Sequence, residues 1–251
     1  MAHGAIVCSE HPRARVLAIH TDEAADMPGV VRILTADDIP GERVLGLYAK
    51  DWPVYIKVGE VTRYIGDPLA CVVAETEAEA RAAAACVKVD SEVLTPLLDL
   101  EEAETPPIHI HENGNILLDK TIRRGEPVDE ALARCAFTAE ATYRTQAVEH
   151  AFIEPEATLA VPEAGGVRLY VQSPGIWHDK TDIAALLHVP TPTVTVTLAD
   201  SGGAFGGKED FTCQPHAAPA AYLLGRPVTV RLPRHEPLPM PPKPPGMKHP
   251  Y

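Results

Sequence analysis

The chain has 251 residues, 45% of them hydrophobic and 23% charged, a composition typical of a globular protein with a buried core. Its formal net charge of −13 at pH 7 argues against nucleic-acid binding, because a protein that binds phosphates needs a basic face. The sequence contains no apolar run of about 18 residues, so it predicts no membrane-spanning helix. It also lacks a basic and apolar leader, which predicts a cytoplasmic protein.

The first hundred residues alternate short strand-like runs with two helix-like segments. Apolar and β-branched runs predict strands over residues 4–8, 15–20, 30–34, 69–74 and 87–91. Acidic residues followed by alanines predict helices over residues 21–25 and 76–86, the second with Thr76 as its N-cap. This order describes a compact α+β domain, which we expect to span residues 1–100.

Residues 101–122 are predicted to be a linker, because prolines and polar residues dominate this part of the chain. The linker contains His109 and His111, but an isolated H-x-H pair lacks the further ligands that a zinc site needs. The cysteines are also unsuited to a zinc or iron–sulfur site built from this chain alone, because no two of them have C-x-x-C spacing. We therefore expect no metal ligands here, and we interpret the cysteines as buried free thiols.

A second α+β domain is expected over residues 123–232. Its predicted helices cover residues 128–135, 177–188 and 214–224, the last closed by Gly225, and its predicted strands cover residues 137–146, 167–171 and 193–198. Prolines crowd the remaining residues, 233–251, which predicts an irregular tail, because proline disrupts both helices and central strands.

Between the last predicted strand and the last predicted helix lies a glycine-rich loop, residues 199–210. Three interpretations of this loop compete. Gly202, Gly207 and Lys208 have the spacing of a nucleotide-binding P-loop, but Glu209 stands where magnesium binding requires Ser or Thr. The loop could instead be a turn without a ligand, or its free N–H groups could bind an anion or an oxo group.

A second polar cluster surrounds His150, which has three glutamates close to it in the sequence, namely Glu149, Glu154 and Glu156. Three carboxylates around one histidine suit acid–base catalysis. The same residues could also alternate across a sheet and serve only as structural hydrogen-bonding groups.

The loop carries a family resemblance. Residues 202–210 spell Gly-Gly-Ala-Phe-Gly-Gly-Lys-Glu-Asp, which resembles the G-G-G-F-G-G-K-E signature of the molybdenum hydroxylases, the xanthine dehydrogenase and aldehyde oxidase family, with Ala204 replacing a glycine. Residues 11–15, 27–30 and 66–68 resemble segments of that family's a/b hammerhead domain. Residues 149–156 resemble its E-H-x-x-L-E-P-E motif, which implies that His150 and Glu154 are structural.

The resemblance extends over residues 4–232 and implies an α+β fold, with an a/b hammerhead domain followed by the first part of a molybdopterin-binding domain. Molybdenum-binding subunits of this family are longer, so the chain resembles an N-terminal fragment that is inactive alone. The implied enzyme is a xanthine dehydrogenase-like hydroxylase of purines, other N-heterocycles or aldehydes, with water as the oxygen source. The implied cofactor is molybdenum–molybdopterin, including its cytosine dinucleotide form. The implied partners are the rest of the subunit and the subunits or domains with 2Fe-2S and FAD.

The resemblance also assigns site residues. Gly203, Ala204, Phe205 and Gly206 would lie against the cofactor, and Gln172 would hydrogen-bond an oxo group on molybdenum. Glu209 would orient the substrate, which favours a purine, because a carboxyl group can hydrogen-bond ring nitrogens. The general base of the family is a glutamate that has no counterpart in this sequence. The alternative is a non-catalytic domain that retains the fold and binds a partner subunit or a nucleotide.

Overall fold

The computed structural model of the chain describes residues 1–46, 49–104, 107–112, 114–233 and 246–250. The chain divides into two compact units. The first unit combines Met1–Pro96 with His150–Pro242, and the second combines Leu97–Glu149 with Lys243–Tyr251.

A seven-stranded mixed sheet forms the centre of the first unit. In spatial order its strands are β11 (Val194–Leu198), β10 (Gly166–Val171), β9 (Ala157–Glu163), β12 (Val228–Arg231), β1 (Ala2–Cys8), β6 (Pro68–Ala74) and β3 (Val30–Leu34). The pairs β11–β10 and β12–β1 are parallel, and the other neighbours are antiparallel. The sheet therefore contains strands from both sides of the domain boundary expected near residue 100. The domain boundaries at residues 100 and 123 stay a prediction.

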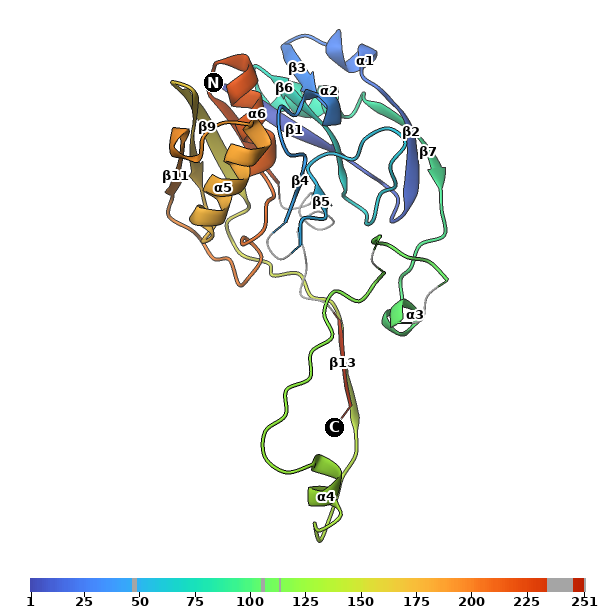
Figure 1. Ribbon diagram of the computed structural model, residues 1–251. Coiled ribbons are helices and arrows are strands. Elements are labelled where there is room, and N and C mark those ends of the chain that lie inside the picture. Colours follow the sequence, from blue (N-terminus) through green and yellow to red (C-terminus); the bar gives the residue numbers. More distant parts are fainter. Residues whose placement is uncertain (47–48, 105–106, 113, 234–245, 251) are drawn as a thin grey trace. The chain divides into compact units, whose positions relative to one another are not determined.

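Helices cover both faces of this sheet, as β6 shows. All seven residues of β6 are buried, and successive side chains of a strand point to opposite faces. Cys71 and Val73 belong to the same hydrophobic cluster as residues of α5 (Ile176–Leu187) and α6 (Gln214–Leu224), which lie side by side in Figure 1. Ala70 and Val72 pack instead with residues of α1 (Asp22–Ala25) and α2 (Glu77–Ala84).

The helix boundaries follow local signals. Thr76 caps α2 as predicted, since its side chain accepts a hydrogen bond from the Glu79 N–H. Helix α6 spans the predicted residues and ends at Gly225, which has a positive φ of 62°. Pro219 lies inside α6, where it removes one backbone donor, but the residues from Gln214 to Ala221 are all buried, so tertiary packing stabilises the helix.

Two short strand pairs complete the first unit: β2 (Ala14–His20) with β7 (Lys88–Val93), and β4 (Val44–Leu45) with β5 (Trp52–Pro53). The 3-10 helices η1 (Ala36–Asp38) and η2 (Thr191–Thr193) lie in connecting segments.

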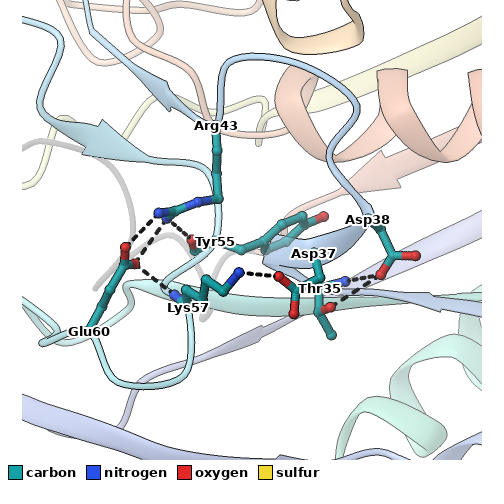
Figure 2. A network of polar contacts seen from close by, with 7 residues as sticks. All are labelled: Thr35, Asp37, Asp38, Arg43, Tyr55, Lys57 and Glu60. Atoms are coloured by element: carbon teal, nitrogen blue, oxygen red, sulfur yellow. Dashed lines mark hydrogen bonds and ion pairs between the residues drawn. The ribbon is translucent and has the colours of Figure 1, made fainter.

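Figure 2 shows a network of polar contacts in the segment that contains η1, β4 and β5. Its centre is the Arg43 guanidinium, which donates to the Tyr55 carbonyl at 2.7 Å and to both carboxylate oxygens of Glu60 at 2.5 and 3.0 Å. None of these short elements between β3 and β6 was predicted.

The second unit contains α3 (Leu100–Glu104), α4 (Val128–Leu132) and the antiparallel pair of β8 (Thr142–Thr145) with β13 (Met247–Pro250). Its elements are shorter than predicted: α4 ends three residues before the predicted end at residue 135, and β8 covers only part of the predicted 137–146 strand. The reason is that no described residue of this unit is a buried hydrophobic one, so little packing extends its elements. Residues 234–245 of the predicted irregular tail lie outside the described residues.

In the part of the chain that the structure describes, no helix combines the length and the hydropathy needed to cross a membrane.

Candidate functional site

The glycine-rich loop connects β11 with α6 and has an unusual backbone. Gly203 and Gly206 have φ values of 102° and 83°, and Phe205, which has a side chain, has a φ of 53°. A positive φ costs about 1–2 kcal/mol for a residue with a side chain, so the fold holds Phe205 in a strained conformation. Phe205 is 76% exposed. The loop therefore holds an aromatic ring out into the solvent, where it is available to a ligand.

The peptide groups of the loop are also available. Gly207 N–H donates to the Ala204 carbonyl at 2.9 Å, which closes a tight turn around Phe205. Among the described residues, no hydrogen bond engages the N–H groups of Ala204, Phe205 or Gly206. These donors suit an oxygen-rich ligand, in agreement with the third interpretation of the loop.

The segment around His150 supports the loop from within the first unit. Gly202 N–H donates to Glu154 Oε2 at 2.6 Å, and Lys208 Nζ lies 3.7 Å from the same oxygen. Lys208 Nζ also lies 4.6 Å from the centroid of the Phe152 ring. A Cβ on Gly207 would be 2.6 Å from His150 Nδ1, so only glycine fits there without a shift of the histidine. These contacts agree with the predicted structural role of His150 and Glu154.

The position of Lys208 argues against the P-loop interpretation. A P-loop lysine reaches the phosphates of a nucleotide. Lys208 is only 2% exposed, and its ammonium group faces Phe152 and Glu154, not the outer face of the loop. Its contacts indicate that it anchors the loop to the protein.

Gln172 follows directly after β10. Strands β10 and β11 are parallel, with Val171 opposite Leu198, so Gln172 and the glycine-rich loop leave the sheet at the same edge. The Ala199 N–H donates to the Val171 carbonyl at 2.7 Å and continues this pairing into the loop. The carboxyl ends of parallel strands are where α/β sheets bind ligands.

The carboxamide of Gln172 lacks a partner for its oxygen. Gln172 Oε1 is buried and has no hydrogen bond within the described residues. It lines a polar cavity of about 10 Å³ together with Ser173, Lys208, Thr212 and Gln214, among others. The structure thus brings Gln172 and the buried end of the glycine-rich loop to one cavity. A cavity of this size has room for at most one water molecule and not for an organic ligand.

Glu209 lies at the end of the loop nearest α6, and its side chain is exposed. Its backbone carbonyl would be 3.6 Å from a Cβ on Gly175, so this end of the loop lies beside the turn that follows Gln172. Burial raises the pKa of the next residue, Asp210, and the nearby Glu209 raises it further.

The sequence analysis missed one residue of this region, Asp179 in the first turn of α5. Its side chain is 1% exposed, and burial raises its pKa to about 7, while the polar side chains of Ser173 and Gln214 oppose the rise. An aspartate in a first turn is common because it interacts with the helix dipole, so no sequence signal distinguishes a buried one.

The donor set of the site decides which groups it fits. Within the described ranges, no three His, Cys, Asp or Glu residues are grouped so that they could hold a metal ion. The available N–H groups of the loop and the exposed Phe205 ring suit an organic cofactor with polar substituents. Because the described side chains provide no set of metal ligands, a metal ion would fit this site only as part of an organic cofactor that coordinates it.

Two family models match the chain. The one described as "Aldehyde oxidase and xanthine dehydrogenase, a/b hammerhead domain" matches residues 1–95, and the one described as "Molybdopterin cofactor-binding domain" matches residues 108–251. Together they confirm the predicted fold class.

Relatives and solved structures agree with these matches. A probable xanthine dehydrogenase subunit of Bacillus subtilis is 33% identical over 238 residues, which are 94% of this chain and 32% of that protein. The large molybdopterin subunit of nicotinate dehydrogenase from Eubacterium barkeri is 32% identical over 94% of this chain and 55% of its own length. The structure of an aldehyde oxidoreductase from Desulfovibrio gigas superposes with a TM-score of 0.89 at 27% identity, covering 97% of this chain and 28% of that one. The chain thus spans between 28% and 55% of the length of these proteins.

Proposed function

Because the chain belongs to the molybdenum hydroxylases, the xanthine dehydrogenase and aldehyde oxidase family, we propose that it forms the N-terminal part of the molybdenum-binding subunit of such an enzyme. The observation that carries the proposal is the shared sheet edge, where the Gln172 carboxamide and the glycine-rich loop with its available N–H groups follow two parallel strands.

In the proposed enzyme, Gly203, Ala204, Phe205 and Gly206 form the surface against which a molybdenum–molybdopterin cofactor lies. The backbone N–H groups of the loop bind polar substituents, and the Phe205 ring provides an apolar face. The side-chain amide N–H of Gln172 donates a hydrogen bond to an oxo group. When bound, the cofactor would make water nucleophilic and accept two electrons from the substrate.

We assign the substrate to the purines, other N-heterocycles or aldehydes. The names of the relatives mention xanthine, nicotinate and aldehydes, which belong to these classes. Glu209 would orient a heterocycle by hydrogen bonds to its ring nitrogens, since its side chain is exposed beside the Gln172 turn. The general base lies outside this chain.

The proposed partners follow from the cofactor chemistry. Two electrons must leave the site, so we propose subunits or domains with 2Fe-2S clusters and FAD, together with the rest of the molybdenum subunit. We propose the cytosine dinucleotide form as one form of the cofactor. The chain alone is expected to be inactive, because the general base and further cofactor contacts are absent from its sequence.

The test uses the complex that contains this chain, purified with its natural partner polypeptides. We expect bound molybdenum by elemental analysis and hydroxylation of at least one compound of the proposed classes. Glu209→Gln should lower kcat/KM for a purine about ten- to a hundredfold, the loss of a hydrogen bond to a charged group, at unchanged molybdenum content. Phe205→Ala should lower the molybdenum content as well.

Two results would contradict this proposal. A complex without molybdenum would favour the non-catalytic alternative. Full activity of Glu209→Gln on purines would remove the role of Glu209 while leaving the cofactor assignment intact.

A further inference from the structure

The Gln172 carboxamide has a buried side and an accessible side. Its oxygen is buried and has no hydrogen bond within the described residues. Its nitrogen also lacks a hydrogen bond to those residues, but it is not among the buried atoms, and the side chain as a whole is half-buried. Rotation of the carboxamide by half a turn would exchange the two atoms, so the orientation with the oxygen inside needs a physical cause.

The buried oxygen faces a cavity whose lining carries both hydrogen-bond donors and acceptors. Lys208 contributes an ammonium group, which can only donate, and Glu156 contributes a carboxylate, which accepts when it is ionised. Gln214 contributes a carboxamide, whose Oε1 accepts hydrogen bonds from the N–H groups of Thr212 and Cys213, both at 3.1 Å. The oxygen of Gln214 is thus used by the backbone, and its amide protons remain as donors.

The size and the charge of the cavity decide what it can hold. With a volume of about 10 Å³, it has room for one water molecule and not for an organic ligand. Lys208 and Glu156 have opposite charges and lie on the same lining, which favours a neutral ligand over an ion. Water is neutral, and it both donates and accepts hydrogen bonds, so it suits this mixed lining.

We propose that one ordered water molecule occupies this cavity and fixes the orientation of the Gln172 carboxamide. The donors of Lys208 and Gln214 engage the lone pairs of the water. Its protons then go to acceptors, the Glu156 carboxylate and the Gln172 oxygen, so the Gln172 nitrogen stays on the accessible side. The water site follows from the lining of the cavity. The use of the accessible N–H group, donation to an oxo group, rests on the proposed function.

The test is joint X-ray and neutron diffraction from crystals of this chain grown in heavy water, because neutrons locate deuterons directly. We expect a water oxygen about 2.5–3.0 Å from Gln172 Oε1, with a deuteron directed at that atom. Both amide deuterons of Gln172 should lie on the accessible side. A cavity without water, a water whose deuterons all point elsewhere, or a carboxamide with its nitrogen inside would overturn the proposal.

Gln172→Glu separates the two sides of the group. The variant keeps an acceptor oxygen toward the cavity, so its crystal structure should retain the water, and loss of the water would overturn the proposal. It also replaces the accessible N–H group by an acceptor, so the complex that contains this chain should retain molybdenum about tenfold less well. Gln146→Glu is the matched control, because it makes the same change at an exposed glutamine outside the first unit and should leave the molybdenum content unchanged.

The two readouts keep this proposal distinct from the proposed function. If the water is found in a complex that never binds molybdenum, the proposed function fails and the water site stands. If molybdenum binds but the cavity holds no water, the water site fails and the proposed function stands. If the water is found and Gln172→Glu retains molybdenum as the wild type does, the assigned use of the N–H group is wrong.

Discussion

Replacement of Glu154 by alanine tests how the glycine-rich loop is held. The variant removes the acceptor of the Gly202 N–H, which donates to Glu154 Oε2 at 2.6 Å. It also removes the carboxylate 3.7 Å from Lys208 Nζ, an ammonium group on a residue that is only 2% exposed. The loop would then lose the side-chain anchor of Gly202 and one of the groups that compensate the buried charge of Lys208.

The size of the effect follows from these two contacts. A hydrogen bond to a charged group contributes about 1.5–3 kcal/mol. The ion pair adds less, because the Glu154 side chain is 39% exposed and solvent screens the interaction, which gives about 0.5–1 kcal/mol. We expect Glu154→Ala to lower the free energy of unfolding by about 2–4 kcal/mol. Glu154→Gln retains an acceptor for Gly202 and should cost about 1 kcal/mol.

The assay is urea denaturation followed by circular dichroism, with the free energy obtained by linear extrapolation. Glu163→Ala is the control, because Glu163 forms an ion pair with Arg168 at 2.7 Å between side chains that are 36% and 37% exposed. This surface pair should contribute less than about 1 kcal/mol. A loss for Glu154→Ala no larger than that of Glu163→Ala would refute the argument that this carboxylate anchors the loop.

Gly207→Ala should lower the urea midpoint, at a cost of about 1–3 kcal/mol, because its Cβ would lie 2.6 Å from His150 Nδ1, and an unchanged midpoint would contradict the close approach. Burial lowers the pKa of His216 to about 3, so the unfolded chain binds more protons below its usual pKa of about 6.5, and stability should fall as the pH decreases from about 6.5 to 3. At pH 5 the loss amounts to about 2 kcal/mol, and denaturation of His216→Gln should show a correspondingly shallower decline. Limited proteolysis should cleave residues 97–149 before residues 68–74, since the described part of the second unit lacks buried hydrophobic residues, and early cuts in β6 would be the contrary result.

Much of the fold was predictable because its signals are local. The alternation of β-branched residues predicted β11, and the predicted helix over residues 214–224 corresponds to α6 with Gly225 at its end. Strand β9 was missed, although residues 149–158 were considered for a sheet, because its Pro162 and the glutamates around it obscure the strand pattern. Strands β4 and β5 contain two residues each, too few for any periodicity.

In the second unit, the predicted helix and strand are longer than the observed ones. The patterns over residues 128–135 and 137–146 predicted a full helix and a long strand, whereas α4 and β8 have five and four residues. Periodicity indicates which face of an element could be buried, but the element forms fully only when another surface covers that face. The described residues of this unit supply no such surface.

The sequence by itself determined the family, through the motif over residues 202–210, and with it the fold class and the candidates Gln172, Phe205 and Glu209. A motif can do this because glycine positions and the residues beside a ligand are constrained one by one. Only the tertiary structure decided that Gln172 leaves the sheet at the same edge as the loop, that Lys208 is buried beneath the loop, and that Asp179 is buried. These facts depend on strand register and on packing between residues far apart in the chain. The burial of a charged side chain depends on its neighbours in space, and no local pattern records them.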